Sequence, residues 1–351
     1  MTGEREPGTV TFRDPAYFAD LRVELALGSP AIALDLDRRR VVLEGEEVPF
    51  DGLILATGAV PRILPGCEVM DGVHTLRSLD DAVAIRSALD RGPHVVVVGA
   101  GFIGSEVAAS ARTRGLDVTV LEMLPVPLVR AVGEEMGRVC ASLHLDHGTD
   151  LRCGVGVEAF QGAGRVDAVR LSDGTTLPAD LVVVGVGVQP ATGWLTTSGL
   201  TLRDGVVCDA ALGAGPPSVF GAGDIVRWDD PRTGLQVRVE HWTNAVEQGM
   251  HAARNLLAGS AAQPFSSVPY FWSDQYGVRI QLVGLPTGEE DEVRICHGSV
   301  DDRTFVALYR RGGRLVAAFG MNSPKLVMQY RTAIAAGVAW EDAVASADAA
   351  R

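Results

Sequence analysis

Strand-like and helix-like runs of apolar residues alternate along the chain. Val95–Val98 is a continuous β-branched run, as in a strand covered on both faces, and residues 102–114 carry small and apolar side chains at helical spacing. The segment "DVTVLE" that follows has the pattern of a second strand. The alternation predicts an α/β fold.

The loop between the first strand and the helix contains Gly99, Gly101 and Gly104 at G-x-G-x-x-G spacing, and Phe102 and Ile103 complete it. The first glycine permits a tight turn, the second lets backbone approach a pyrophosphate, and the third lets helix and strand pack closely. The N-terminus of the helix offers N–H groups to a phosphate. Because strand, loop, helix and strand occur in register, we predict a dinucleotide-binding site; a structural glycine turn is the alternative.

Glu122 ends the second strand, where a carboxylate accepts a hydrogen bond from a ribose 2′-hydroxyl. A carboxylate there repels the 2′-phosphate of NADP, and the segment "MLPVPL" that follows contains no Lys or Arg to neutralise one. We therefore predict that the site binds NAD rather than NADP.

Composition narrows the class of protein. The 351 residues carry a formal net charge of -13, which disfavours nucleic acid as a partner. No apolar run is long enough for a membrane span and the N-terminus lacks signal-peptide features, so we expect no membrane partner and a cytoplasmic location. The five cysteines form no C-x-x-C pair, which favours reduced thiols over a disulfide framework.

Two further stretches, "FDGLILATGAVPR" and "PSVFGAGDIV", each lead a strand-like run into a glycine turn. Their order around the first glycine motif resembles that of flavoproteins in which an NAD domain is inserted into an FAD domain. The segments "EHWTNAVEQGMHAARNLL" and "PYFWSDQYGVRIQLVG" most resemble the FAD-dependent ferredoxin reductases of oxygenase systems, the family of putidaredoxin and rhodocoxin reductases.

The resemblance implies two Rossmann-like domains and a C-terminal α+β domain. Its expected boundaries are a partial FAD domain at residues 1–91, an NAD domain at 92–205, the returning FAD segment at 206–260, and a reductase or dimerisation-type domain at 261–351. Residues 1–93 lack the family's first G-x-G-x-x-G, so the chain is expected to start late and to bind FAD weakly or not at all. A start codon assigned too late is the favoured explanation, and a true truncation is the other.

The resemblance also implies roles for individual residues. Glu106 is expected beside the nicotinamide, with Gly185 and Gly187 along the nicotinamide passage. The expected FAD contacts, from the adenosine and pyrophosphate side to the isoalloxazine ring, are Thr57, Gly58, Arg62, Gly221, Gly223, Asp224, Trp242 and Trp272. Packing in a core or domain interface is the alternative for both tryptophans, and compensation of a helix dipole is the alternative for Glu106.

The activity implied is that of an NADH:ferredoxin reductase, which passes a hydride from nicotinamide C4 to flavin N5 and then single electrons to a [2Fe-2S] ferredoxin. Arg310, Arg311 and Arg314 surround a Gly-Gly turn, and Lys325 and Arg331 are expected to extend them into a basic docking patch for an acidic ferredoxin. A solvated hairpin tip is the alternative.

Two other functions stay open at this stage. One is an NADH-dependent flavoprotein with another acceptor, such as a rubredoxin, a quinone, oxygen or a disulfide. The other is a flavin-free remnant that binds NAD without enzyme activity.

The remaining motifs favour no other chemistry. His144 and His147 have H-x-x-H spacing, but no third ligand is evident nearby, so we expect no metal site and instead the basic, solvent-facing helix end of similar reductases. Ser105 and Ser198 lack the context of a nucleophile elbow, which argues against a hydrolase.

Overall fold

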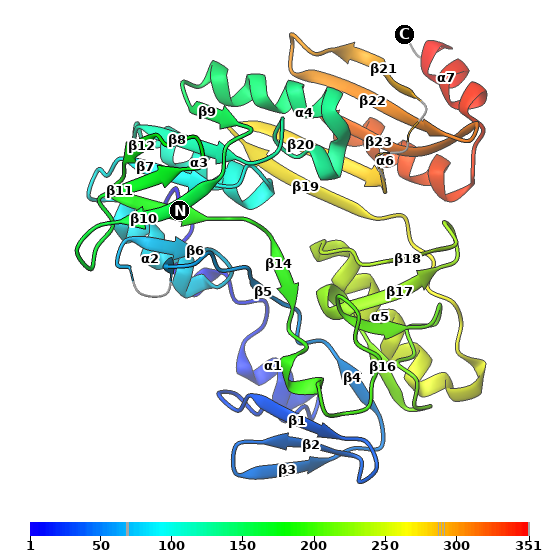
Figure 1. The fold of residues 1–351 in the computed structure, drawn as a ribbon. Helices are drawn as coiled ribbons and strands as arrows, with labels where there is room; N and C mark the ends of the chain where they lie inside the picture. Colours follow the sequence, from blue (N-terminus) through cyan, green and yellow to red (C-terminus); the bar gives the residue numbers. More distant parts are fainter. Residues whose placement is uncertain (68–69, 287, 289, 291, 350–351) are drawn as a thin grey trace. The chain divides into compact units, whose positions relative to one another are not determined.

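The computed structural model describes residues 1–67, 70–286, 288, 290 and 292–349, and the chain divides into two compact units (Figure 1). Unit 1 comprises Met1–Gly3, Pro61–Val188 and Val268–Arg351, and unit 2 comprises Glu4–Val60 and Gln189–Ser267. Among the described residues, no helix is both long and apolar enough to cross a membrane.

The centre of the first half of unit 1 is a parallel sheet in the order β6-β13-β7-β8-β9. The strands and the two helices beside them are β6 (Val73–Thr75), β13 (Leu181–Val184), β7 (Val95–Val98), β8 (Val118–Glu122), β9 (Asp150–Cys153), α2 (Leu79–Leu89) and α3 (Phe102–Thr113). The predicted strand–loop–helix–strand unit is therefore present, and the α/β prediction is confirmed.

Successive side chains of β7 point to opposite faces of the sheet, and other elements cover both faces. Val95 and Val97 pack with α2 and α3 in one cluster, whereas Val96 and Val98 pack with a small antiparallel sheet on the other side. A continuous valine run suits this strand because neither face meets water. The small sheet contains β10 (Val157–Gln161), β11 (Ala168–Leu171) and β12 (Thr176–Pro178).

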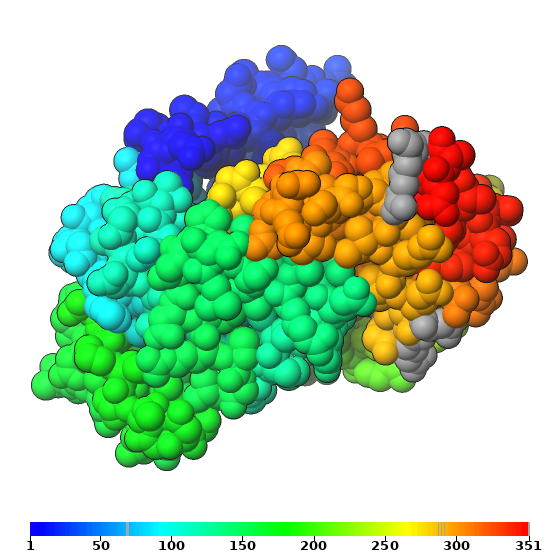
Figure 2. Space-filling view, turned by 90° about the horizontal axis from the view of Figure 1, so that it is seen from above, coloured from blue at the N-terminus to red at the C-terminus, as the bar shows by residue number. Residues whose placement is uncertain are grey.

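The second half of unit 1 is an antiparallel sheet in the order β19-β20-β23-β22-β21. Its elements are β19 (Tyr270–Gln275), β20 (Val278–Gly284), β21 (Glu292–Ser299), β22 (Thr304–Arg311), β23 (Arg314–Met321), α6 (Pro324–Ala335) and α7 (Trp340–Ala349). Helix α4 (Val129–Asp146) packs on one face through Met136 and Leu143, and α6 and α7 cover the other through Val327 and Trp340. The surfaces of the two halves adjoin in Figure 2, where α4 is green and β21 and β22 are orange.

Unit 2 contains short sheets and one long helix. Its sheets are β1-β2-β3 (antiparallel), β4-β16 (parallel) and β15-β17-β18, and β5 pairs with β14 where the chain passes between units. Its elements are α1 (Pro15–Asp20), β1 (Ala31–Asp35), β2 (Arg40–Leu43), β3 (Glu46–Pro49), β4 (Leu53–Leu55), β5 (Ala59–Pro61), β14 (Val188–Pro190), β15 (Val206–Cys208), β16 (Val219–Gly221), β17 (Val226–Asp230), β18 (Leu235–Val237) and α5 (Trp242–Ala258). Single turns of 3-10 helix lie at Pro7–Thr9, Gly193–Leu195, Gly223–Ile225 and Gly259–Ala261.

Candidate functional site

Two glycines of the loop between β7 and α3 are required by close backbone contacts. Gly99 has a φ of +98°, and a Cβ atom there would lie 2.4 Å from the carbonyl oxygen of Gly185. A Cβ atom on Gly104 would lie only 1.9 Å from the carbonyl oxygen of Gly99. Any larger residue at either position would push the helix away from the strands.

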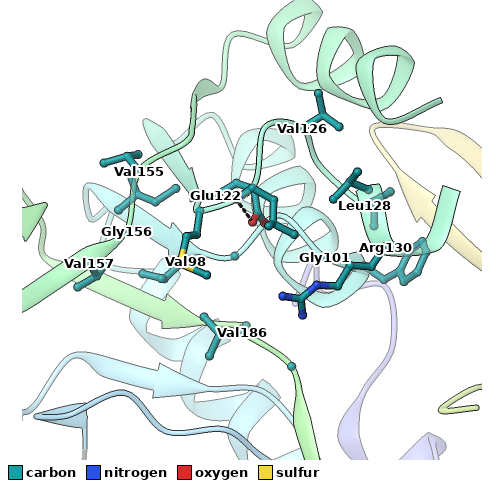
Figure 3. Close-up of a pocket in the computed structure, with 18 of the residues that line it drawn as sticks. Val98, Gly101, Glu122, Val126, Leu128, Arg130, Val155, Gly156, Val157 and Val186 are labelled. Carbon is teal, nitrogen blue, oxygen red and sulfur yellow. Dashed lines mark hydrogen bonds between the residues drawn. The ribbon is translucent and has the colours of Figure 1, made fainter. Parts of the chain in front are cut away.

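Gly101 has a different reason to be glycine. A Cβ atom at this position would meet no protein atom within 4 Å, because Gly101 faces a cavity of about 380 Å³ at the N-terminus of α3 (Figure 3). The cavity lies wholly within unit 1, and apolar side chains such as Val98, Val155 and Val186 form much of its wall. Space beside a bare helix N-terminus suits the phosphates of a dinucleotide.

Glu122 lies at the end of β8 and fixes the glycine loop. Its carboxylate accepts hydrogen bonds from the backbone N–H groups of Ala100 and Leu124, each at 2.8 Å, and the side chain lines the cavity (Figure 3). A carboxylate has about four lone-pair sites, so these two bonds leave acceptor capacity for ribose hydroxyls.

Arg130 is a cavity residue that the sequence prediction missed. Helix α4 starts beside the glycine loop because Leu128, at φ +56°, donates its N–H to the carbonyl oxygen of Ala100 at 3.2 Å. This contact places the guanidinium of Arg130 at the cavity, near Gly101 in Figure 3. The segment "MLPVPL" contains no Lys or Arg, but the first turn of α4 that follows it supplies Arg130 to the same cavity. The prediction of NAD over NADP therefore rests on the Glu122 carboxylate alone.

The two glycines predicted along the nicotinamide passage, Gly185 and Gly187, line the same cavity. Gly187 has a φ of +100°, and its carbonyl oxygen accepts the backbone N–H of Arg62 at 2.9 Å. Arg62 and the two glycines belong to unit 1, so this hydrogen bond is internal to that unit.

Glu106 lies in the second turn of α3 and does not line the cavity described above. Its Oε1 atom accepts a hydrogen bond from the Ser273 hydroxyl at 2.6 Å, and burial is the main cause that raises the pKa of this carboxyl group. The helix-dipole alternative fails, because α3 begins at Phe102 and has no acidic residue in its first turn.

In unit 2, the predicted glycine turn follows β16 directly. A Cβ atom on Gly221 would lie 2.6 Å from Val226, and Gly223, at φ +78°, donates its N–H to the Gln248 side chain at 2.8 Å. Asp224 is largely buried in the 3-10 turn that follows. Sequence reasoning missed Gln248, whose buried Nε2 atom has no hydrogen-bond partner among the described residues.

Thr57 and Gly58 follow β4, the strand that pairs with β16. The Thr57 hydroxyl donates to the carbonyl oxygen of Ala191 at 3.2 Å and accepts from the Trp194 indole at 3.4 Å, and Gly58 has a φ of +69°. Both carboxyl strand ends of the β4-β16 pair thus carry the residues predicted for FAD, as expected for a cofactor at the carboxyl edge of a parallel sheet.

Neither predicted flavin-contacting tryptophan is a core residue. Trp242, the first residue of α5, is 57% exposed and stacks on Phe12 with ring centroids 6.3 Å apart. Trp272, on β19, is 39% exposed and stacks on Tyr270 at 5.8 Å. Packing in the core of a unit is therefore excluded as their role.

Only His147 of the histidine pair lies exposed at the end of α4, whereas His144 is fully buried, which contradicts the expected solvent-facing position for that residue. Its Nδ1 atom lies 2.8 Å from the Tyr276 hydroxyl and its Nε2 atom 3.2 Å from the Ser105 hydroxyl, and burial lowers its pKa to about 4. His147 stacks on Tyr276. The described residues contain no group of three His, Cys, Asp or Glu side chains placed to hold a metal.

The expected basic patch is not one surface. Arg311 and Arg314 face each other across the β22–β23 hairpin, Arg310 pairs with Glu292 at 3.5 Å, and Arg314 donates to the carbonyl oxygen of Gly337 at 2.8 Å. Lys325 follows the other end of β23, and a strand of this length spans roughly 25 Å. Lys325 therefore does not join the hairpin arginines.

Comparisons with known proteins support the resemblance inferred from the sequence. The chain is 37% identical over 331 residues to rhodocoxin reductase from Rhodococcus erythropolis, covering 93% of this chain and 76% of the relative. It is 34% identical to the ferredoxin reductase subunit of a 5,5'-dehydrodivanillate O-demethylase from a Sphingobium species, covering 99% and 85%. It also matches the crystal structure of a covalent putidaredoxin reductase–putidaredoxin complex with a TM-score of 0.90 and 31% identity, covering 96% of this chain and 82% of the other.

Two family descriptions match adjacent parts of the chain. The first, pyridine nucleotide-disulphide oxidoreductase, matches residues 8–249, and the second, reductase C-terminal, matches residues 270–351. The first match contains the glycine loop with Glu122 and Arg130, and the second contains Ser273 and the arginine hairpin. The chain therefore belongs to the pyridine nucleotide-disulphide oxidoreductase family and carries the C-terminal domain of its ferredoxin reductases.

Proposed function

We propose that this protein is an NADH-dependent, FAD-containing ferredoxin reductase that supplies electrons to an oxygenase system. The observation that carries the proposal is the cavity at the N-terminus of α3, where the Glu122 carboxylate and the Arg130 guanidinium accompany the bare backbone of Gly101. This set matches two parts of NADH that need recognition, because a carboxylate suits ribose hydroxyls and a cation with N–H groups suits a pyrophosphate.

The neutral wall of the cavity also excludes water from the nucleotide. Gly185 and Gly187 give the nicotinamide half a flat backbone surface, and Val98, Val155 and Val186 supply apolar contact. Arg130 has no ion-pair partner among the described residues, so its charge is available for a phosphate. Glu106 is the acidic residue that we assign to the nicotinamide end.

The residues of unit 2 fit FAD. Asp224 places a carboxylate in the buried turn that begins at Gly223, and Thr57 and Gly58 lie at the adjacent strand end. The buried, unpartnered Nε2 atom of Gln248 adds a donor beside the turn. Bound FAD would supply the ability to take a hydride from NADH and to give up electrons singly. The part of these residues is to bind and orient the cofactor, with Trp242 as the aromatic surface that unit 2 offers to the flavin ring.

A [2Fe-2S] ferredoxin is the proposed electron acceptor. The family matches include ferredoxin–NAD(+) reductase components of anthranilate 1,2-dioxygenase and biphenyl dioxygenase systems, at 36% and 34% identity. The β22–β23 hairpin with Arg310, Arg311 and Arg314 is the proposed docking surface, because it is a local group of cations on a protein with a net charge of -13. A cytoplasmic location belongs to the same proposal, since the absence of any C-x-x-C pair in the sequence favours reduced thiols over a disulfide framework.

The test is acceptor-resolved kinetics with purified protein and added FAD. We expect NADH to bleach the flavin absorbance, and a [2Fe-2S] ferredoxin to restore it faster than a rubredoxin, a quinone or a disulfide does. A preference for a disulfide or quinone would overturn the ferredoxin assignment. NADH binding without any flavin reduction would favour the non-enzymatic alternative.

A further inference from the structure

A row of three polar side chains joins α3 to β19 inside unit 1. The Ser273 hydroxyl lies 2.6 Å from Oε1 of Glu106, and the Nε2 atom of Gln275 lies 3.0 Å from the Ser273 oxygen. Ser273 and Gln275 are both fully buried, and they project to the same side of β19 because their positions differ by two. The row therefore ends on the one acidic residue that we assign to the nicotinamide.

The hydrogen bonds of the row have a defined direction. An amide nitrogen only donates, so the Ser273 oxygen accepts from Gln275 and directs its own hydrogen to Glu106. A hydrogen bond donated to a carboxyl oxygen favours the ionised form of the group. The row is thus built to hold Glu106 as a carboxylate with one fixed orientation.

Two other features oppose that ionised state. Glu106 is largely buried, and the Asp274 carboxylate on β19 also raises its pKa, although Arg279 pairs with Asp274 at 2.9 Å. The hydrogen bond from the Ser273 hydroxyl acts in the opposite direction and lowers the pKa of Glu106. The Oε1 atom of Gln275 is buried and makes no hydrogen bond with the described residues, which costs stability, so fold stability alone does not explain this glutamine.

We propose that Ser273 and Gln275 are positioning residues that keep Glu106 charged beside the nicotinamide and thereby set how strongly the protein prefers NAD+ to NADH. This inference rests on the proposed function, which places the nicotinamide near Glu106. The ring of NAD+ carries a positive charge and the ring of NADH does not, so a fixed carboxylate stabilises the oxidised nucleotide selectively.

The same charge favours hydride transfer. When the C4–H bond of NADH breaks, the hydride and its electron pair would pass to bound FAD, and the nicotinamide ring would become a cationic pyridinium. A carboxylate already oriented toward the ring stabilises the charge that develops during this step. Loss of the row is therefore expected to weaken the product complex and to slow flavin reduction, with NADH affinity little changed.

The experiment measures the dissociation constants of NAD+ and NADH by calorimetry and NADH fluorescence on the full chain, at one pH. We expect Ser273→Ala and Gln275→Met to raise the ratio of the NAD+ to the NADH constant by about threefold to tenfold, and Glu106→Gln to raise it at least as much. Ser273→Thr retains the hydroxyl and should keep the parent ratio. The double variant Glu106→Gln/Ser273→Ala should show no further change over Glu106→Gln.

Ser105→Ala is the matched control, since Ser105 is an equally buried serine on α3 that contacts His144 instead of Glu106. It should leave the ratio unchanged. If Glu106→Gln raises the ratio but neither Ser273→Ala nor Gln275→Met does, the positioning role is wrong and the proposed function stands. If the parent chain binds neither nucleotide, the proposed function itself fails. Thermal unfolding of each variant separates loss of the row from loss of the fold.

Discussion

The carboxylate of Glu122 bonds to the backbone N–H of Ala100 at 2.8 Å, which ties the end of β8 to the middle of the glycine loop. The residue that we propose to distinguish ribose from a phosphorylated ribose is thus also a structural member of the glycine loop. Substitutions at Glu122 must therefore be chosen to separate a change in charge from a change in loop geometry.

Glu122→Gln removes the charge and retains one oxygen acceptor. We expect NADPH to gain relative to NADH by about tenfold in kcat/KM, because the 2′-phosphate no longer meets a carboxylate. Glu122→Ala removes the hydrogen bonds that hold the glycine loop, so it serves as the comparison for a change in loop geometry. It should weaken the binding of both NADH and NADPH. A parent enzyme that already prefers NADPH would refute the specificity argument.

Substitutions at two glycines of the loop should fail in different ways. Gly104→Ala should reduce the stability of the whole unit, because its Cβ atom would lie 1.9 Å from the Gly99 carbonyl oxygen. Gly101→Ala should leave the melting temperature close to the parent value and lose most NADH affinity, since its Cβ atom meets only the cavity. Thermal unfolding and NADH titration are measured on both proteins, and equal destabilisation by the two changes would contradict the assignment of the cavity.

Arg130→Gln should weaken NADH binding by about tenfold to 100-fold, the range expected for losing a charged hydrogen bond to a phosphate. Salt screens the attraction between Arg130 and the phosphate in the parent protein, so the difference in NADH affinity between parent and variant should shrink as salt is added. Arg138→Gln is the matched control, because Arg138 lies on the same helix, is exposed and pairs with Glu134 at 2.6 Å. NADH affinity that falls equally in both variants would show a general effect of charge rather than a contact in the cavity.

Local sequence pattern predicted the part of the site between Val95 and Glu122, whereas Gly185 and Gly187 were predicted only from the family resemblance. The valines of β7, the glycine loop and Glu122 are neighbours along the chain, and each has a local physical reason for its residue type. Arg130 was missed because its position at the cavity depends on the backbone turn at Leu128, which has a φ of +56°. The spacing of apolar residues along the sequence does not indicate such a turn.

The contacts made by the C-terminal sheet were beyond sequence reasoning for a related reason. Ser273 meets Glu106 across 167 positions, and Tyr276 meets His144 across 132, so only the packing of β19 on α3 and α4 brings them together. The prediction that Lys325 extends the basic patch of the hairpin was wrong, because the extended strand β23 separates Arg314 from Lys325 although the two are close in sequence.

Charge reversal at the hairpin tests ferredoxin docking. Arg311→Glu/Arg314→Glu should slow ferredoxin reduction by about tenfold or more at low salt and flatten its salt dependence, while NADH reduction of the flavin stays unchanged. Lys325→Glu, at the other end of β23, should have little effect. Because Arg314 also donates a hydrogen bond to the carbonyl oxygen of Gly337, the unfolding midpoint of the double variant must be compared with that of the parent. Equal loss in both half-reactions would point to misfolding or to a different docking face.

The buried His144 should make the stability of unit 1 depend on pH. Burial lowers its pKa from 6.5 to about 4, so as the pH falls from 6.5 toward 4 the unfolded chain takes up a proton that the folded chain does not. The neutral histidine therefore contributes stability that is fully present above pH 6.5 and is lost on acidification, up to about 3 kcal/mol.

The measurement compares urea unfolding of the parent and of His144→Gln between pH 7.5 and 4.5. Carboxylates and the other buried histidine, His241, titrate in both proteins, so the difference between the two free-energy curves isolates His144. We expect the curves to converge as the pH falls, because the parent loses the contribution of His144 and the variant has none to lose. Curves that stay parallel over this range would mean that His144 takes up a proton in the folded protein as readily as in the unfolded chain, which would contradict its burial in a neutral form between Tyr276 and Ser105.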